Sequence, residues 1–377
     1  EDIIAGISLY RPGPMDFIPQ YIKGKNNPES IHYDCPQLEP ILEPTYGCIV
    51  YQEQVMQIVR ELGGYTLGRS DLVRRAMSKK KAAVMEKERR NFVYGNPEEG
   101  VPGCVSKGIS EEVANHIYDE MIDFAKYAFN KSHAAAYAVV SYQTAYLKYY
   151  YPIEFMAALM TSVIDNPTKV AEYILTCRQM GIEILPPDVN KGEGSFSVDN
   201  GCIRYGLSAI KSIGKPVIEG LVEERSARGP FVSLQDFIER LPAKDRNKRV
   251  LENLIKAGAL DCVPGTRKEC MMVYVQILDQ INQEKKTAMP GQMTFFDILG
   301  EGEREAFSIR MPKAGEYEKE QLLAFEKEVL GVYISGHPLA EYENLWKKNI
   351  TAVTSDFMLD DETGVSRVRD GQTAVLG

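Results

Sequence analysis

The spacing of apolar residues predicts helices over most of the first 180 residues. An apolar stretch at 3–9 runs into a Pro-Gly-Pro turn, in which proline fixes φ and glycine permits a sharp reversal. Residues 16–50 carry several Pro and Gly and are expected to be irregular. Further helices are expected at 49–62, 70–77 and 111–128, from the alanines at 134–136 to Pro152, and on to about Met180. The fold class is therefore mainly α.

A different pattern begins near residue 182. Short strands are expected at 182–185, 196–198 and 202–205, with a hairpin turn at Asp199-Asn200-Gly201. This small β-hairpin element near 182–205 indicates a domain boundary near residue 190. Beyond it, helices are expected at 248–257, closed by Gly258, and at 315–334, and residues 370–377 have the pattern of a first strand of a β domain.

Residues 207–224 have the pattern of a helix-hairpin-helix. Apolar residues at helical spacing lead to Ile213, Gly214 turns the chain, and Pro216 suits the first turn of a second helix. Such a hairpin offers backbone N–H groups to a DNA phosphate without reading bases, although similar hairpins also pack against proteins. A Walker A phosphate loop is excluded, because Pro216 follows Lys215 where Ser or Thr is required.

Length and composition bound the class of protein. The chain has 377 residues, 44% of them apolar and 26% charged, which predicts two or three domains. No apolar run approaches the ~20 residues of a membrane span, so no membrane partner is expected. The chain opens at Glu1 inside an apolar stretch, without an initiating Met or a signal peptide, and we expect it to be a fragment of a longer protein.

The seven cysteines lie far apart, with no Cys-x-x-Cys and no Cys/His cluster of zinc spacing. This distribution favours reduced, structural thiols in a cytoplasmic protein and predicts no metal site.

The charge distribution is locally uneven. The net charge is −9, yet residues 60–90 contain ten basic residues against four acidic ones, a local net of +6. For the helix at 70–77, Ser70 is the expected N-cap, and Leu72, Val73, Ala76 and Met77 are expected to pack inward. The outward residues are then Arg74, Arg75 and Lys79 to Lys81. A charge run is usually a solvated face, but few acidic residues accompany this one. A solvated face and a binding surface for a polyanionic partner therefore both stay open.

Polar donors surround the start of the helix that follows Phe129. Lys131 and His133 flank Ser132, which is the expected N-cap. The first backbone N–H groups of a helix have no intrahelical partner, so this N-terminus is a natural anion site for a triphosphate or a nucleic-acid backbone. Arg11, next to the Pro-Gly-Pro turn, is either an exposed loop residue or a second anion contact. For Tyr142 and Tyr146, packing in a protein core is favoured over stacking on nucleic-acid bases.

A polar linker at 283–291 leads to Gln292-Met293-Thr294-Phe295-Phe296. Adjacent bulky apolar side chains in a polar loop are costly to expose. They either dock locally or form a short peptide that anchors in a pocket on a partner.

Taken together, these segments resemble the catalytic alpha subunits of bacterial DNA polymerase III, the C-family replicases. The resemblance covers essentially the whole chain in order, and it rests on residues 9–15, 49–56, 72–77, 129–137, 205–207 and 335–339. It implies a helical fingers domain at 1–190, a clamp-binding domain at 191–350 with the helix-hairpin-helix and a clamp-motif loop at 283–300, and the truncated start of an oligonucleotide-binding (OB) domain at 351–377.

The resemblance also implies roles for individual residues. The implied nucleotide or template contacts are Arg11, Arg74, Arg75, Lys79, Lys131, Ser132 and His133. The implied DNA contacts of the helix-hairpin-helix are Ile213, Gly214 and Lys215, and the implied sliding-clamp contacts are Gln292, Met293, Phe295 and Phe296. Met293 and Phe295 stand where the family frequently has Leu, and both side chains can fill apolar pockets.

The implied activity is DNA-templated DNA synthesis by a nucleotidyltransferase. The implied partners are template-primer DNA, deoxynucleoside triphosphates (dNTPs), the beta sliding clamp and other holoenzyme subunits. Polymerases hold two Mg²⁺ ions on carboxylates, which in this family lie in the palm and are expected upstream of residue 1. No Asp-x-Asp pair occurs here, and Asp360-Asp361 lies in a polar loop. No catalytic or metal-binding residue is therefore expected in this chain, which should not polymerise alone. The alternative is a non-catalytic DNA-binding or scaffolding module built on the helix-hairpin-helix.

Overall fold

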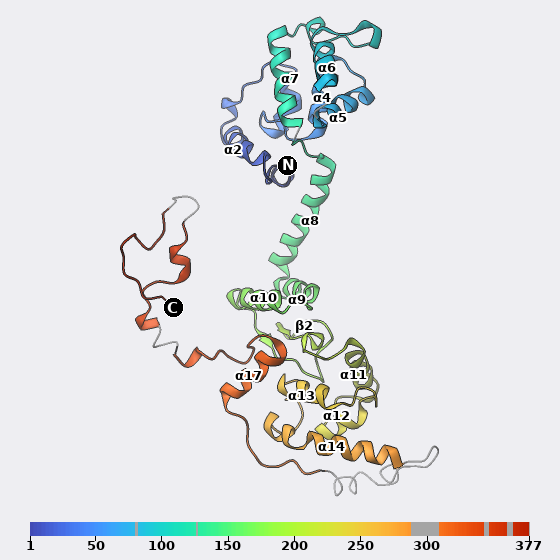
Figure 1. The fold of residues 1–377 in the computed structure, drawn as a ribbon, viewed down its shortest axis with the longest axis vertical. Coiled ribbons are helices and arrows are strands. Elements are labelled where there is room, and N and C mark those ends of the chain that lie inside the picture. Colours follow the sequence, from blue (N-terminus) through green and yellow to red (C-terminus); the bar gives the residue numbers. More distant parts are fainter. Residues whose placement is uncertain (80–81, 126, 288–308, 343–346, 360–364, 377) are drawn as a thin grey trace. The chain divides into compact units, whose positions relative to one another are not determined.

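The computed structural model describes residues 1–79, 82–125, 127–287, 309–342, 347–359 and 365–376. The described residues are mainly helical, as predicted, and fall into two compact units, Glu1–Leu147 and Lys148–Gly377 (Figure 1). The division between the units lies within one helix, at residues 147 and 148. It does not test the predicted functional domains at 1–190, 191–350 and 351–377, which stay predictions. In the described ranges, no helix is long and apolar enough to cross a membrane.

The first unit consists of helices joined by short loops. Its helices are α1 Asp2–Leu9, α2 Ile18–Asn26, α3 Glu39–Leu42, α4 Gln52–Gly63, α5 Leu67–Ser78, α6 Ala82–Tyr94, α7 Glu111–Ala125 and α8 Lys131–Tyr150, which continues into the second unit. Short 3-10 turns lie at Pro14–Phe17, Pro28–Ser30, Glu43–Thr45, Pro97–Glu99 and Val105–Lys107. Residues 16–50 are thus less irregular than predicted. Only Tyr21 and Gly24 of α2 are buried, which leaves almost no apolar stripe for sequence analysis to find.

Helix α4 forms the centre of the core of the first unit. Its apolar residues at helical spacing are almost fully buried against residues of α6 and α7; they are Val55, Ile58, Val59 and Leu62. The helix predicted at 111–128 is confirmed as α7, in which the apolar residues Ile117 and Met121, one turn apart, are 1% and 0% exposed. These helices give the first unit a rigid frame on which the surrounding loops are placed.

Helix α5 begins earlier than predicted. The hydroxyl of Thr66 accepts a hydrogen bond from the backbone N–H of Arg69, so Thr66 is the N-cap. Ser70 is buried inside the helix, and its hydroxyl donates to the carbonyl of Leu67 at 2.7 Å. Leu72 is 65% exposed rather than inward, whereas the inward prediction for Val73, Ala76 and Met77 is confirmed.

The second unit combines a small sheet with a helical core. Its elements are α9 Pro152–Ser162, α10 Pro167–Gln179, β1 Ile184–Leu185, β2 Ser197–Asp199, β3 Cys202–Arg204, α11 Lys215–Arg228, α12 Leu234–Arg240, α13 Lys248–Lys256, α14 Arg267–Thr287 and α17 Lys319–Leu330, with 3-10 turns at Leu207–Ala209, Ala340–Tyr342 and Thr354–Phe357. Strand β3 pairs parallel with β1 and antiparallel with β2, with Val198 opposite Ile203. The predicted hairpin turn is confirmed, because Asn200 and Gly201 both have positive φ.

The first helix predicted for the hairpin at 207–213 is wrong. Only a 3-10 turn forms at Leu207–Ala209, and Ile210 is extended. The backbone N–H of Lys211 donates to the carbonyl of Val329 at 2.9 Å, and the Asn253 amide donates to the Lys211 carbonyl at 2.7 Å. These contacts with α17 and α13 replace the bonds that would have continued the helix. The second helix, α11, begins at Lys215 with Pro216 in its first turn, as predicted.

A buried carboxylate organises the segment 334–339. Glu326 of α17 is 1% exposed, and its Oε2 accepts hydrogen bonds from the backbone N–H groups of Ile334 and Ser335 at 2.8 and 3.0 Å. The guanidinium of Arg267 lies 3.7 Å from the other oxygen of this carboxylate and pairs with Asp261 at 2.8 Å. The start of the Ser-Gly-His-Pro-Leu motif at 335–339 is therefore held on α17 by a buried carboxylate that Arg267 of α14 pairs with.

The predicted strand at 370–377 is represented in the described residues only by an isolated bridge between Ala352 and Leu376. The OB-type domain thus stays a prediction.

Candidate functional site

The candidate site surrounds residues 127–131, which we call the junction. Tyr51 and Phe129 form a parallel bridge although 78 residues separate them along the chain. The backbone N–H of Gln52 donates to the carbonyl of Phe129 at 2.9 Å, and that of Phe129 donates to the carbonyl of Val50 at 3.1 Å. Helix α4 therefore starts at Gln52, three residues later than predicted, because the residues before it are extended to make this pairing.

Gln54 secures the α4 side of this pairing. The side chain is 5% exposed, and its Oε1 accepts hydrogen bonds from the backbone N–H groups of Val50 and Tyr51 at 2.9 and 3.0 Å. Its Nε2 donates to the carbonyl of Ile41 and to the hydroxyl of Thr45. A buried amide with these partners has its hydrogen-bonding groups largely satisfied and holds the start of α4 in place.

Gln52 connects α5 to the junction. Its amide nitrogen donates to the carbonyl of Ala128 at 3.1 Å, and its amide oxygen accepts a hydrogen bond from the guanidinium of Arg74 at 3.2 Å. Arg74 also donates twice to Asp71, at 2.7 and 3.0 Å, and its side chain is only 16% exposed. Arg74 is thus not the outward-facing residue that the sequence predicted, but a half-buried charge aimed at the junction.

Arg11 reaches the junction from the turn after α1. Its guanidinium donates to the carbonyl of Tyr127 and to that of Ser8, and it lies 4.7 Å from the centre of the Phe129 ring. Burial lowers the pKa of Arg11, although a guanidinium still carries its charge at neutral pH. The contact with Phe129 is a cation–π interaction, which leaves the positive charge in place beside the junction.

The start of α8 differs from the prediction in its cap. The side-chain oxygen of Asn130, not that of Ser132, accepts a hydrogen bond from the backbone N–H of His133, at 2.8 Å. The backbone N–H of Lys131 donates to both oxygens of Glu53, at 3.0 and 3.1 Å. The helix N-terminus therefore already holds a carboxylate, because Glu53 of α4 supplies the anion that favours this end of the helix dipole.

The side chains around this N-terminus remain candidates for contact with a ligand. The ammonium group of Lys131 lies 3.3 Å from the carboxylate of Glu1 and 5.2 Å from the centre of the Tyr51 ring. The exposed His133 ring stacks obliquely between Phe129 and Tyr137, with centroids 5.4 and 4.8 Å away. Ser132 is exposed in the first turn. Tyr142 and Tyr146 of α8 are 63% and 45% exposed, so neither is a core residue here.

Two guanidinium groups share the carboxylate of Asp71. Arg74 binds one oxygen, and Arg75 binds the other at 2.7 Å. Hydrogen bonding by Arg74, aided by the charge of Arg75, lowers the pKa of Asp71. One carboxylate cannot neutralise two cations, and Arg75 is 62% exposed. Lys79 is exposed at the C-cap of the same helix.

Other cations of the basic run at 60–90 are paired with carboxylates that the sequence did not indicate. Arg69 binds the carboxylates of Glu88 and Glu99, and Arg89 binds Asp119. Glu99 and Asp119 lie outside the run, so counting charges between residues 60 and 90 could not find them. In the described part of the run, Arg69 and Arg89 are thus paired with carboxylates, whereas Arg75 and Lys79 are exposed.

Two family models and several known proteins match this chain. The family model of the bacterial DNA polymerase III alpha subunit finger domain matches residues 1–100, and a helix-hairpin-helix motif model matches residues 181–270. The DNA polymerase III subunit alpha of Thermus aquaticus is 45% identical over 350 residues, or 92% of this chain. Those of Borreliella burgdorferi and Bacillus subtilis are 41% and 42% identical over 96% and 97% of the chain. The resemblance to the DNA polymerase III alpha subunits is confirmed.

The chain spans only part of these alpha subunits, namely 27% of the Thermus aquaticus, 30% of the Borreliella burgdorferi and 31% of the Bacillus subtilis protein. The finger-domain match includes Arg11, Arg74, Arg75 and Lys79, whereas the junction lies beyond it. The sequence does not single out Gln52 and Glu53 as site residues. Both lie in the segment 49–56, which carries part of the resemblance to the alpha subunits, but only the fold shows that they contact residues 128–131.

The predicted hairpin residues lie within residues 181–270, which the helix-hairpin-helix motif model matches. Ile213 is 7% exposed and belongs to the core of the second unit, so its side chain holds the hairpin in place. Gly214 is the exposed N-cap of α11, and the Lys215 side chain is 81% exposed, 3.7 Å from Glu219. The predicted clamp contacts at 292–296 lie outside the described residues.

Proposed function

We propose that the full-length protein is a replicative DNA polymerase and that this chain supplies its fingers and its clamp-binding region. The names of the relatives and the finger-domain match support this proposal. The reaction is DNA-templated addition of deoxynucleotides to a primer. The sequence has no Asp-x-Asp pair, so its carboxylates do not fit the two-Mg²⁺ arrangement. We assign the metal-binding carboxylates to the rest of the protein and expect this chain alone to be inactive.

The observation that carries the proposal is the convergence of three cations on the junction. Arg11, Arg74 and Lys131 come from separate segments. Arg11 binds the carbonyl of Tyr127 and Arg74 binds the side-chain amide of Gln52, whereas Lys131 belongs to the junction itself, where Glu53 holds its backbone N–H. Fixed positive charge of this kind stabilises the charge that develops on a transferring phosphoryl group or a leaving pyrophosphate. We therefore place the triphosphate of a dNTP or the template backbone against this surface.

The geometry divides the candidate contacts into two groups. Arg74 and Arg11 are engaged with protein carbonyls, an amide and Asp71, so they position the junction and supply charge from behind it. Arg75, Lys131 and His133 are more exposed and have donors available for direct contact, with Ser132 and Lys79 beside them. In this view the helix N-terminus itself contributes no free N–H at Lys131, since Glu53 binds it.

The test is steady-state kinetics of the full-length protein on primed DNA. Arg75→Ala and Lys131→Ala should each raise the dNTP KM or lower kcat by at least tenfold, which is about 1.4 kcal/mol of binding or transition-state free energy. Lys107→Ala is the matched control, because this exposed lysine of the same unit donates only to the backbone carbonyl of Glu61. Ordinary kinetics for both Arg75→Ala and Lys131→Ala would refute the assignment.

We also propose that residues 292–296 bind the beta sliding clamp. A Gln followed by bulky apolar residues is costly to leave in water, and the hydrophobic pair Phe295 and Phe296 suits an apolar pocket. Gln292→Ala together with Phe296→Ala should abolish binding of the chain to a clamp ring in calorimetry. Gln321→Ala, on the exposed face of α17, should bind like the wild type. Unchanged affinity of the double variant would mean that these residues dock locally instead.

The remaining proposals follow the same resemblance. The hairpin at Gly214 and Lys215 contacts a DNA phosphate without base recognition, residues 351–377 begin an OB-type domain, and other holoenzyme subunits bind the full-length protein in the cytoplasm. The seven cysteines, all free, suit a reducing compartment.

A further inference from the structure

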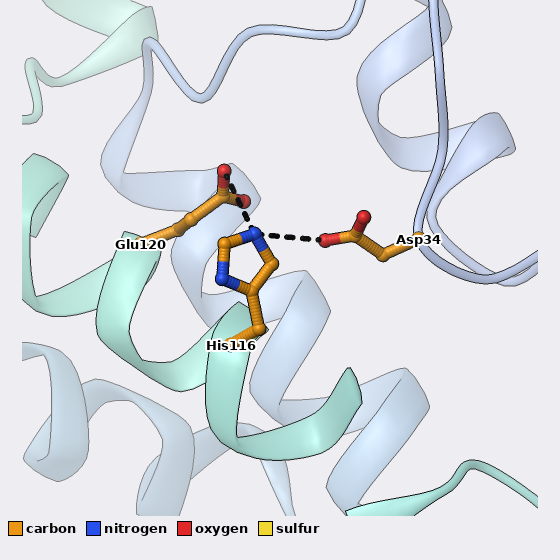
Figure 2. A group of neighbouring side chains, drawn as sticks. All are labelled: Asp34, His116 and Glu120. Atoms are coloured by element: carbon orange, nitrogen blue, oxygen red, sulfur yellow. Dashed lines mark ion pairs between the residues drawn. The ribbon is translucent and has the colours of Figure 1, made fainter. Parts of the chain in front are cut away.

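Three ligand-type side chains meet on the first unit, away from the junction. Asp34 lies in the loop before α3, and His116 and Glu120 lie one turn apart on α7 (Figure 2). The Nε2 atom of His116 is 3.5 Å from Oδ2 of Asp34 and 3.8 Å from Oε1 of Glu120. One ligand atom from each residue lies within 4.8 Å of the others. From these contacts we infer that this cluster is a binding site for a divalent transition-metal ion of the Zn²⁺ type.

The spacing of the ligand atoms suits such an ion. Zn²⁺ binds imidazole nitrogen and carboxylate oxygen at about 2.0–2.2 Å, so two ligands of a tetrahedral site lie about 3.3–3.6 Å apart. The two distances from His116 are at or slightly above this value. A small rotation of the partly exposed Glu120 side chain closes the difference. One imidazole with two carboxylates also favours Zn²⁺, Mn²⁺ or Co²⁺ over Mg²⁺, which prefers oxygen ligands alone.

The backbone holds all three residues in place. Residues 117 and 121, on the core side of α7, are 1% and 0% exposed, which directs His116 and Glu120 of the same helix toward the loop. The loop is anchored by Cys35 and Leu38, which are 6% and 3% exposed. The ligands are therefore presented by a buried frame, and a metal ion would fasten the loop at 31–38 to α7.

The charges of the cluster favour a cation. In the described part of the chain, Asp34 and Glu120 each form an ion pair with His116 alone. The carboxylates of Asp34 and Glu120 lie beside the same imidazole, with one ligand atom of each within 4.8 Å of the other, so their negative charges repel each other in the absence of a cation. A divalent ion removes this repulsion. Because the His116 side chain is 61% exposed, the remaining coordination positions of the ion are open to water.

Binding is tested on the whole 377-residue chain, stripped with a chelator and kept reduced. Calorimetry with Zn²⁺ should show one saturable site that His116→Gln and Asp34→Asn each weaken at least tenfold. His32→Gln, which removes the exposed imidazole two residues before Asp34, is the matched control and should bind like the wild type. Zn²⁺ should also raise the Tm of the wild type and of the control but not of the two site variants. Equal affinity of wild type and His116→Gln, or no saturable binding to the wild type, would overturn the inference.

Cysteine ligation is the competing origin of a zinc signal, since Cys262 is exposed. Co²⁺ in place of Zn²⁺ separates the two, because thiolate ligands produce an intense near-ultraviolet charge-transfer absorption that nitrogen and oxygen ligands lack. A bound spectrum without that absorption, lost in Glu120→Gln, supports the site. A thiolate spectrum that persists in Glu120→Gln would overturn it. Circular dichroism of each variant verifies that the helices are intact, which the exposure of His116 leads us to expect.

Discussion

The carboxylate of Glu53 binds the backbone N–H of Lys131 with both oxygens, at 3.0 and 3.1 Å. One residue is in the first turn of α4 and the other begins α8, so a single side chain joins two helices through residues that lie 78 positions apart in the sequence. It also means that the anion-binding end of α8 is occupied from within the protein. The nucleotide that we propose at this surface would therefore meet side chains, chiefly those of Lys131 and His133, rather than the Lys131 backbone N–H.

Replacing Glu53 should destabilise the first unit. Glu53→Ala removes the acceptor for Lys131 and for the side chain of Asn130, which donates at 3.2 Å. Loss of a helix-capping carboxylate costs about 1–2 kcal/mol of unfolding free energy. Urea unfolding followed by circular dichroism measures the change. Glu61→Ala, which breaks only the exposed pair with Arg60, should cost less than about 0.5 kcal/mol. Equal costs for the two variants would contradict the role given to Glu53.

Two glycines near Arg11 should respond to alanine with opposite signs. Gly13 has φ of 100°, and a Cβ atom there would lie 2.7 Å from the ring of Tyr127, whose carbonyl Arg11 binds. Gly13→Ala should lower the unfolding free energy by about 1–3 kcal/mol and weaken the Arg11 contact. Gly6, inside α1, has open space around it, so Gly6→Ala should stabilise the chain by up to about 1 kcal/mol. Thermal unfolding of both variants decides; destabilisation by Gly6→Ala, or none by Gly13→Ala, would be inconsistent with this geometry.

The shared carboxylate of Asp71 predicts a pH dependence. Its pKa in the folded chain is lowered, first by the hydrogen bond from Arg74, below the ordinary value of about 3.9. A lowered folded pKa contributes stability that is fully present above the unfolded pKa and is lost as the pH falls through the folded one. In Asp71→Asn, stability should therefore fall less steeply below about pH 4 than in the wild type. Urea midpoints between pH 6 and pH 2.5 give both curves, and parallel curves would argue against the shared carboxylate.

The hairpin of the second unit should bind duplex DNA through phosphates alone. Affinity should be independent of base sequence and should fall steeply as salt rises, because bound phosphates release counterions. Lys215→Ala, which removes a side chain that is 81% exposed, should lower the slope of log affinity against log salt by about 0.9. Lys191→Ala, at another exposed lysine of this unit, should leave the slope unchanged. Fluorescence anisotropy at several salt concentrations measures it. A salt-independent affinity would rule out phosphate contact.

The sequence by itself determined the local structure and the family. Residues at helical spacing fixed the buried stripes of α4 and α7, and the Asn200-Gly201 pair fixed the hairpin turn, because side-chain periodicity and backbone freedom act over a few residues. The ordered motifs, such as the one at 129–137, identified the resemblance to the alpha subunits. Each of these signals is contained in a short stretch of chain.

Only the tertiary structure decided which groups meet. Lys211 binds α17 instead of continuing a helix, Glu53 replaces an external anion at Lys131, and Arg74 turns toward Gln52 rather than solvent. The cluster of Asp34, His116 and Glu120 likewise depends on a loop reaching α7. Such partners lie far apart in sequence, and their choice follows from burial and from satisfying polar groups in the folded chain, which no local pattern records.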